Sequence, residues 1–242
     1  MGLSPLIENM KIGVWNIDHP EIDTRSRAKQ DRYERILCFL EGACCDIYVL
    51  TETNSALQLP GYKTCFSDES PFKRKSRSYA PPNRYHQVGI YSRFSISKMN
   101  IAEPINGVLG RLPDAGVISS LYGNAVTIKD QWKKDSPLKY SDRLKEQISA
   151  INSLPDRKTI VAGDFNLRLG WPQKAFAHEA LGRALESREW VWPTKSQSTT
   201  VQHVLHTPDI SMELSLDQSV KETSSAGPAL SDHPFLLVNV SD

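Results

Sequence analysis

Residues 159–171 read TIVAGDFNLRLGW, and the rest of the chain can be arranged around this stretch. Residues 159–162 are an apolar run that ends at Gly163, a pattern typical of a strand buried on both faces. Asp164 and Asn166 follow at its carboxyl end, where open α/β sheets usually hold their ligands. Side chains at i and i+2 of an extended segment point to the same side, so both can reach one small polar target. Taken alone, the motif also fits a strand that ends in an ordinary Asp/Asn turn.

The composition is that of an ordinary soluble globular protein. Of the 242 residues, 39% are hydrophobic and 24% are charged, and the formal net charge is +1. The chain can therefore build a full core, and a nucleic-acid binder of this kind would need local basic clusters. No stretch approaches the roughly 20 apolar residues of a membrane span, and no signal-peptide pattern opens the chain. The four cysteines lack CxxC spacing, so free thiols in an intracellular, cytoplasmic protein without membrane association are expected.

The hydrophobic pattern predicts strands alternating with helices. Helices are expected at residues 27–41, 144–154 and 173–188. Strands are expected at residues 11–16, 46–51, 62–66, 87–91, 94–98, 117–122, 125–129, 159–162, 190–192, 201–205 and 234–240. No repeat, linker or low-complexity tract interrupts this pattern. We therefore expect residues 1–242 to form a single α/β domain, and the protein to be a monomer.

One stretch, residues 72–88, is clearly basic and contains no acidic residue. A solvated surface loop is the simpler interpretation of such a stretch, and contact with a phosphate backbone is the sharper one. Under the second interpretation, Lys73, Arg74 and Lys75 are candidates for substrate binding. Arg168, which follows the GDFN motif at 163–166, is a further candidate for a phosphate contact.

Polar side chains collect at the ends of the predicted strands. Oxygen ligands dominate this set, cysteine is absent, and only one imidazole is well placed. Hard carboxylates suit Mg²⁺ or Mn²⁺ much better than Zn²⁺. A metal that neutralises charge, amides that hold phosphoryl oxygens and an acid/base pair together fit phosphate-ester hydrolysis. The set comprises Asn16, Asp18, Glu52, Tyr122, Asn124, Asp164, Asn166, Asp232 and His233.

Five short motifs carry these residues: WNID at 15–18, TET at 51–53, SLYGN at 120–124, GDFN at 163–166 and LSDH at 230–233. In this order and spacing, the chain resembles the endonuclease/exonuclease/phosphatase superfamily from residue 11 to residue 240. That group includes apurinic endonucleases, to which the motif layout is most similar, as well as DNase-I-like nucleases, sphingomyelinases, inositol-phosphate phosphatases and deadenylases. The resemblance implies a four-layer α/β/β/α sandwich of two mixed β-sheets packed face to face, with helices outside.

The resemblance also implies a metal site and the groups that act on water and phosphate. Glu52 matches the family's direct metal ligand, and Asp18 and Asp232 match ligands that bind directly or through water. The Asp that matches Asp164 orients or deprotonates the attacking water. His233 matches the His that stabilises the pentacovalent phosphate.

Four further positions are candidates for phosphate contact through the same resemblance. Asn16 and Asn166 match residues that hold phosphoryl oxygens during catalysis. SLYGN is similar to the apurinic-endonuclease stretch whose Tyr and Asn contact the phosphate, which makes Tyr122 a catalytic candidate and Asn124 a substrate-binding candidate. Tyr122 also fits a buried core residue whose hydroxyl has a hydrogen-bond partner.

One position departs from the family pattern. Gln202 stands where the family usually carries an Asp that orients the catalytic imidazole. A Gln oxygen can accept a hydrogen bond from the ring but supplies no charge, so an imidazolium at His233 would be less stabilised. A slower enzyme, a substitute carboxylate from Asp209 or Glu213, or a lost activity would each account for the change. We favour an active enzyme because the other motif positions are intact.

The leading hypothesis is a Mg²⁺- or Mn²⁺-dependent phosphodiesterase that acts as a nuclease on DNA or RNA. It rests on the basic residues 72–88, the SLYGN stretch and Arg168, while the near-neutral net charge weakens it. A second hypothesis keeps the chemistry but gives it a small phosphoester, such as a nucleotide, an inositol phosphate or a phospholipid head group. A third, motivated by Gln202, is a catalytically degenerate protein that binds phosphate-bearing partners.

Overall fold

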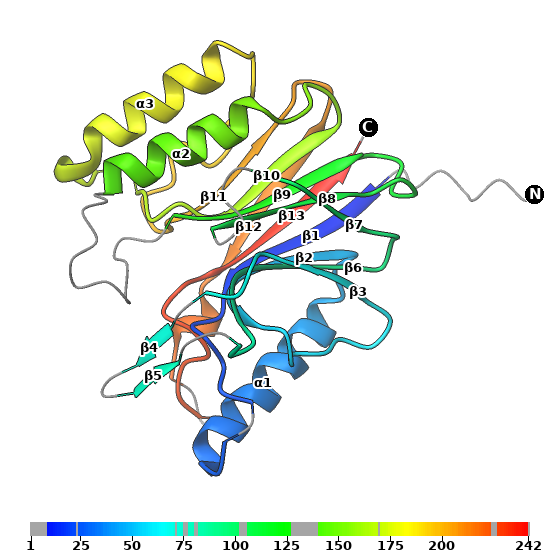
Figure 1. The fold of residues 1–242 in the computed structure, drawn as a ribbon, viewed down its shortest axis with the longest axis vertical. Helices are drawn as coiled ribbons and strands as arrows, with labels where there is room; N and C mark the ends of the chain where they lie inside the picture. Colours follow the sequence, from blue (N-terminus) through cyan, green and yellow to red (C-terminus); the bar gives the residue numbers. More distant parts are fainter. Residues whose placement is uncertain are drawn as a thin grey trace, which may run out of the picture.

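The computed structural model describes residues 9–22, 24–70, 72–74, 77–79, 82–101, 106–126, 140–168, 170–223 and 227–241. Two mixed β-sheets pack face to face, with helices on the outer side of each (Figure 1). The predicted four-layer α/β/β/α sandwich is therefore confirmed. None of the helices in the described part is both long and apolar enough to cross a membrane.

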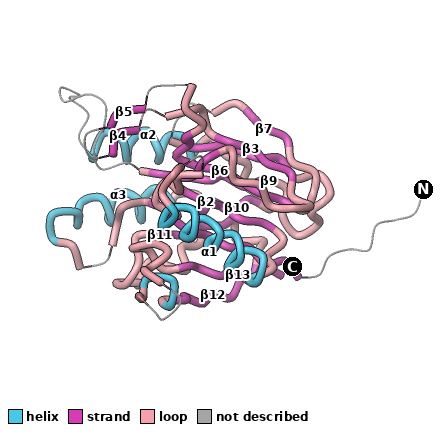
Figure 2. The backbone as a smooth tube through the Cα atoms, turned by 90° about the horizontal axis from the view of Figure 1, so that it is seen from below, coloured by secondary structure: helices cyan, strands magenta, loops and turns pink. Residues whose placement is uncertain are grey.

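The first sheet has the strand order β12–β13–β1–β2–β6–β3. Its strands are β1 (Asn9–Asn16), β2 (Ile47–Asn54), β3 (Lys63–Phe66), β6 (Tyr85–Ser92), β12 (Ser211–Asp217) and β13 (Phe235–Ser241). β1 and β2 run parallel, and helix α1 (Arg27–Ala43) connects them as a βαβ unit. Viewed from below, α1 lies across the strands of this sheet (Figure 2).

The second sheet has the strand order β11–β10–β9–β8–β7. Its strands are β7 (Ser97–Met99), β8 (Gly107–Arg111), β9 (Ser120–Ala125), β10 (Thr159–Asp164) and β11 (Gln202–His206). Helices α2 (Tyr140–Asn152) and α3 (Ala175–Glu186) cover its outer face, and the short helix η1 (Pro172–Lys174) leads into α3 (Figure 1). A hairpin of β4 (Phe72–Arg74) and β5 (Arg77–Tyr79) and the short helix η2 (Ser219–Lys221) complete the elements.

Side-chain alternation along β1 and β10 decides what the strand ends present. In β1, Ile12 and Val14 belong to the core between the two sheets, whereas Trp15 packs toward α1. Asn16 therefore follows on the inner side, because successive side chains of a strand point to opposite faces. The same alternation in β10 brings Asp164 to the inner side of the second sheet. The two polar side chains consequently face each other where the core ends.

The structure corrects several predicted strands. The predicted break at Gly123–Asn124 is wrong, because parallel pairing with β10 keeps β9 extended through Asn124 to Ala125. The strand predicted at 94–98 is reduced to β7, and that at 190–192 to a single bridge between Val191 and His206. β8 and β12 were not predicted, since β8 contains two glycines and β12 lies at a sheet edge with polar side chains at alternate positions. Residues 127–129 of another predicted strand lie outside the described residues.

Candidate active site

The side chain of Asn16 joins the two sheets at one end of the sandwich. Its Nδ2 donates to Asp164 Oδ2, 2.9 Å away at the end of β10, and to Glu52 Oε1, 3.2 Å away in β2. Asn16 and Asp164 are buried, whereas the Glu52 side chain is 30% exposed. Three of the predicted site residues, distant in sequence and carried by different sheets, therefore meet at one point that opens to solvent beside Glu52.

The turn after β10 fixes the Asp164 carboxylate from its other side. The backbone N–H of Asn166 donates to Asp164 Oδ1 (2.7 Å), and Asn166 itself has a φ of 46°. Asn166 Nδ2 donates to Val126 O (2.8 Å), which ties the turn to the end of β9. Gly163 is required here, since its φ is 147° and an added Cβ would lie 1.9 Å from Asn124 O. Both oxygens of Asp164 are thus held in place before any substrate arrives.

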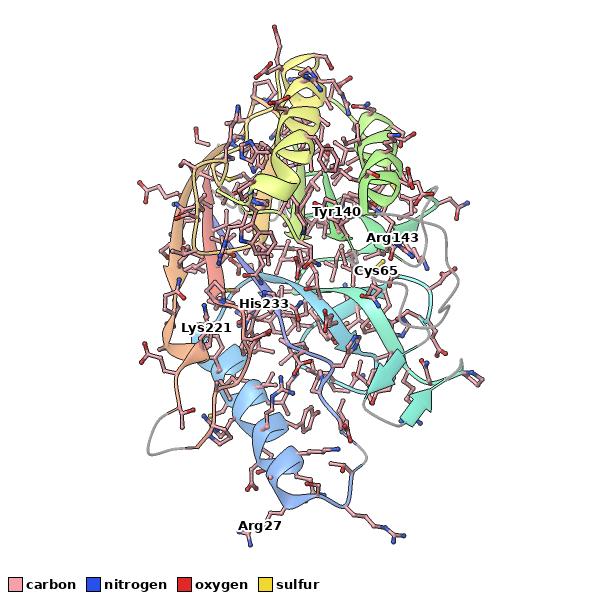
Figure 3. The ribbon with its side chains drawn as sticks, turned by 90° about the vertical axis from the view of Figure 1, so that its left-hand side faces the viewer. Arg27, Cys65, Tyr140, Arg143, Lys221 and His233 are labelled. Atoms are coloured by element: carbon pink, nitrogen blue, oxygen red, sulfur yellow. The ribbon has the colours of Figure 1, made fainter. Side chains whose placement is uncertain are left out.

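The segment before β13 brings His233 to the same end of the molecule. Ser231 Oγ donates to Asn16 O (2.6 Å) and accepts from the N–H of His233 (3.1 Å), and Trp15 Nε1 donates to His233 O (3.1 Å). In Figure 3, His233 lies between α1 and the layer of α2 and α3. Burial raises the pKa of the Asp164 carboxyl, and positive charge on His233 opposes that rise. The imidazole and the carboxylate are therefore close enough to act on each other.

Carboxylates converge around Glu52. Burial, followed by the negative charges of Asp164, Asp18 and Asp232, raises the pKa of Glu52 to about 8. Glu52 also has a φ of 51°, and sparsely populated backbone conformations of this kind cluster at functional sites. Asp18 and Asp232 lie nearer the surface, with side chains 45% and 81% exposed. Such a group of like charges is a place where a cation would be stabilised.

The donor set fits a hard, partly hydrated cation. In the part of the chain that the structure describes, no three His, Cys, Asp or Glu side chains come together as a ready-made metal cage. Mg²⁺ does not need one, because it usually keeps several waters and takes one or two protein carboxylates plus substrate phosphates. Glu52, with Asp18 and Asp232 beside it, offers that kind of ligation.

Two residues near this cluster carried no sequence signal. Arg32 in α1 donates from Nη2 to Ile17 O (2.7 Å) and from Nε to Leu230 O (2.9 Å), and its Nη2 lies 3.7 Å from Asp18 Oδ2. It therefore ties the loop that carries Asp18 to the loop that leads to His233. His19 is buried, and its Nε2 lies 3.6 Å from Glu52 Oε2. Neither position belongs to a motif, and only the fold shows where they lie.

Tyr122 and Asn124 do not join this group. Tyr122 is fully buried beneath α2, and its hydroxyl donates to Gln147 Oε1 (2.8 Å). In the register of the second sheet it pairs with Val161, three residues before Asp164. Asn124, two residues further along β9, points to the same face as Tyr122 and is also fully buried. The unbroken strand, where the motif had suggested a loop, is the physical reason.

Gln202 lies in register with Asp164 in the pairing of β10 with β11. With its amide oriented so that both ends find partners, Nε2 donates to Pro234 O (2.6 Å) and Oε1 accepts from the N–H of Asn16 (2.7 Å). It thus holds the backbone on either side of the site. Among the described residues, the carboxylate that contacts His233 is its neighbour Asp232, whose Oδ1 lies 3.3 Å from Nε2.

Asp209 and Glu213, considered as substitutes for the missing Asp, lie elsewhere. Asp209 accepts hydrogen bonds from the N–H of Lys158 and from Thr207 Oγ1, at the start of β10. Glu213 pairs in register with Asn239, near the far end of β13 from His233. Neither carboxylate reaches the imidazole.

His203 has a structural role. It is fully buried, its Nδ1 accepts from Trp192 Nε1 (3.2 Å) and lies 2.9 Å from Thr194 Oγ1, and its Nε2 is 2.7 Å from Leu167 O. Burial lowers the pKa of His203 to about 4, so the ring is neutral and Nε2 donates to Leu167. The chain just beyond the turn at residues 164–166 is thereby held.

Tyr140 and Lys174 hold the turn itself, and neither was singled out from the sequence. Tyr140 Oη donates to Phe165 O (2.8 Å), and Lys174 Nζ donates to Asn166 O. Lys174 Nζ lies 4.1 Å from the centre of the Tyr140 ring, so the two side chains also contact each other. Tyr140 stands at the end of α2 that faces His233 (Figure 3). Two consecutive carbonyls after Asp164 are therefore fixed by one aromatic–cation pair.

The basic stretch emerges beside the site. Asn83 donates from its N–H to Glu69 Oε2 (2.8 Å), which closes the base of the β4–β5 hairpin. The next element, β6, begins at Tyr85, whose ring meets the His19 ring edge-on at 5.5 Å. Lys73 and Arg74 belong to β4, on the same side of the molecule as the start of β13 (Figure 1). Lys75 lies outside the described residues, and Arg168 stacks on Trp171, with its guanidinium carbon 4.9 Å from the ring centre.

Comparisons with known proteins bear on the family and the fold. A sequence profile described as the Endonuclease/Exonuclease/phosphatase family matches residues 13–233. The search of curated proteins by sequence gave no match. The endonuclease/exonuclease/phosphatase from Beutenbergia cavernae DSM 12333 superposes with a TM-score of 0.67 at 11% identity, over 97% of this chain and 72% of that one.

Two further solved structures share the fold over nearly their whole length. The 3′ phosphatase NExo from Neisseria, bound to a product DNA hairpin, gives a TM-score of 0.63 at 14% identity, with 95% of this chain and 98% of that one covered. An AP endonuclease from Archaeoglobus fulgidus gives 0.60 at 17% identity, with the same coverage of 95% and 98%. At these identities the likeness concerns the fold.

Proposed function

The chain belongs to the endonuclease/exonuclease/phosphatase family, and on that premise we propose that it is a divalent-metal-dependent phosphodiesterase that cleaves nucleic acid. Phosphoester hydrolysis is the chemistry common to the family and to the enzymes with which the fold is shared. The observation that carries the proposal is the Asn16 amide, which bridges Asp164 and Glu52 and so joins a water-activating carboxylate to a metal-binding one.

Asp164 is the group that acts on the attacking water. Its two oxygens are oriented by Asn16 and by the N–H of Asn166, and its pKa is raised by burial, so it is a better proton acceptor than an exposed carboxylate. Both Nδ2 hydrogens of Asn16 are used by Asp164 and Glu52. Asn16 therefore positions these carboxylates, a different role from the phosphate contact implied by the resemblance.

Phosphate oxygens are left to Asn166 and His233. Asn166 Nδ2 uses one hydrogen for Val126 O and retains a second for a phosphoryl oxygen. The His233 side chain is 20% exposed and stands beside Asp232, where an imidazolium can donate to the negative charge that builds during in-line attack. A divalent cation held by Glu52, Asp18 and Asp232 would neutralise part of that charge.

Nucleic acid as the substrate is supported by local charge. The hairpin that contains Lys73 and Arg74 is followed by Tyr85, whose ring contacts the ring of His19. His19 in turn lies next to Glu52. A basic element at the rim of an acidic, metal-binding site can hold the phosphates that flank the one being cleaved. That placement favours a polymeric phosphodiester over a single small ester.

A substrate panel tests the proposal. The purified protein is incubated with plasmid, single-stranded DNA, RNA and bis(p-nitrophenyl) phosphate, each with Mg²⁺ and with EDTA. Cleavage of a polynucleotide that EDTA abolishes is expected. Cleavage of small esters alone would point to a phosphodiesterase of small molecules, and no hydrolysis of any substrate would point to a phosphate-binding protein without activity. An Asp164→Asn preparation, purified in parallel, controls for contaminating nucleases.

A further inference from the structure

A cavity of about 300 Å³ is lined by the segment that follows the catalytic turn (residues 164–166) and by the first residues of α3. Its walls include Arg168, Trp171, Lys174, His178 and Glu179. Lys174 belongs to both places, because it lines the cavity and its Nζ donates to Asn166 O in the turn. Through Lys174, this cavity is connected to the backbone of Asn166, two residues after Asp164.

The chemistry of the walls is aromatic and cationic. The Trp171 ring has the Arg168 guanidinium carbon 4.9 Å and the Lys174 ammonium 4.7 Å from its centre. Glu179 is an acid in this wall, and its carboxylate is paired with Arg183 at 3.7 Å. An indole ring with a guanidinium and an ammonium group against it makes a surface that is both aromatic and positively charged. Flat π-systems that are linked to phosphate bind such surfaces, and nucleobases are the common example.

The size of the cavity limits what can enter it. A volume of about 300 Å³ is at the lower end for small-molecule sites and suits one nucleoside-sized group. A base inside a duplex is stacked and paired, so it cannot enter a pocket without first leaving the stack. Single-stranded segments present their bases freely, and proteins that bind them combine aromatic platforms with basic grooves.

We propose that this cavity receives one unpaired nucleobase from the nucleotide next to the cleaved phosphodiester, so that the substrate is single-stranded or locally unpaired nucleic acid. The inference rests on the proposed nuclease function and specifies its substrate. Trp171 is the stacking platform, Arg168 presents the charged plane, and Lys174 couples the pocket to the catalytic turn.

The test compares two substrates in the full-length protein with Mg²⁺. Base–aromatic stacking of the usual strength corresponds to about 5- to 150-fold in binding. Trp171→Ala is therefore expected to lower kcat/KM for a single-stranded oligonucleotide by about that factor relative to its kcat/KM for bis(p-nitrophenyl) phosphate, mainly through KM. Trp171→Phe should recover most of the loss. Phe176→Ala is the control: it removes a 49% exposed aromatic side chain of α3 outside the cavity and should leave kcat/KM unchanged for both substrates.

An oligonucleotide with a single abasic position identifies the stacked base. The abasic position is moved along the strand. At one site, adjacent to the cleaved bond, removal of the base should raise the KM of the wild-type protein and leave the KM of Trp171→Ala unchanged. Equal losses by Trp171→Ala on both substrates would overturn the inference, since Trp171 would then only support the turn. So would an unchanged KM for the oligonucleotide. If the wild-type protein cleaves the small ester but no polynucleotide, the proposed nuclease function fails first and the inference fails with it.

Discussion

Replacing Lys174 with Met tests how the catalytic turn is held. Met keeps the length and apolar character of the stem but removes the ammonium that donates to Asn166 O and stacks on Tyr140. Hydrogen bonds from charged groups contribute about 1.5–3 kcal/mol, and a cation–π contact about 0.5–2 kcal/mol. Burial lowers the pKa of Lys174, so removing the charge also removes a desolvation cost. We expect a net loss of about 1–3 kcal/mol in the free energy of unfolding.

The same substitution should change catalysis through charge. A positive group near Asp164 stabilises its ionised form, so losing the ammonium raises the pKa of Asp164. The acidic limb of kcat against pH should consequently move to higher pH, with a smaller kcat at neutral pH and little change in KM for a small ester. The assays are urea denaturation followed by tryptophan fluorescence, and hydrolysis of bis(p-nitrophenyl) phosphate across pH.

Tyr140→Phe is the matched control for this prediction. It removes the hydrogen bond to Phe165 O, which contributes about 0.5–1.5 kcal/mol to the free energy of unfolding, and leaves the ammonium of Lys174 in place. Its stability should fall slightly, while the acidic limb stays where it is. Lys174→Arg retains the charge and should return the limb toward the wild-type position. An unchanged limb together with unchanged stability in Lys174→Met would refute the proposed role of the lysine.

Three further predictions concern the surroundings of the site. Arg32→Met should lower stability by about 2–4 kcal/mol and raise the Mg²⁺ concentration needed for half-maximal rate, because two charged hydrogen bonds between the loops are lost. His203→Gln should flatten the acid dependence of stability. Burial lowers the pKa of His203 from 6.5 to about 4. The neutral ring therefore contributes its full stabilisation above pH 6.5, and the wild type loses about 3 kcal/mol of its free energy of unfolding as the pH falls from 6.5 to 4. Changing Lys73, Arg74 and Lys75 to Gln should reduce the salt slope of polynucleotide binding by about two to three.

Each of these has a result that would count against it. Arg157→Met is the control for Arg32→Met: it removes an arginine with an 87% exposed side chain and should leave stability and the Mg²⁺ requirement unchanged. If Arg32→Met behaves in the same way, Arg32 does not hold the two loops together. Equal acid slopes in the wild type and His203→Gln would mean that the ring does not titrate as burial requires. A hairpin variant with the wild-type salt slope would exclude the hairpin from phosphate binding.

The central part of the site could be anticipated because it depends on strand ends. Asn16, Glu52 and Asp164 each end or nearly end a strongly apolar strand, and such runs are read from sequence with little ambiguity. The family resemblance then supplied their common location. Tyr122 shows the limit of this reasoning, because a Gly–Asn pair suggested a turn where strand pairing with β10 kept the chain extended.

Other parts depended on contacts that local patterns do not encode. Lys174 and Tyr140 meet only because η1 and the start of α2 lie on the same side of the turn, and Arg32 reaches two loops that are far apart in sequence. β12 carries polar side chains at alternate positions at a sheet edge, so it lacks the apolar run by which a buried strand is recognised. The basic character of residues 72–88 can be read from composition, whereas only the fold shows that the chain after the hairpin, at Tyr85, reaches His19 beside Glu52.

Turnover by Asp164→Asn tests the account most directly. The substitution keeps the shape of the side chain and an oxygen for the N–H of Asn166, and it removes the proton acceptor. With Mg²⁺ and a substrate that the wild type cleaves, the rate should fall by about 10²- to 10⁴-fold while the melting temperature stays close to that of the wild type. A folded Asp164→Asn variant that hydrolyses phosphodiesters at the wild-type rate would contradict the proposed site.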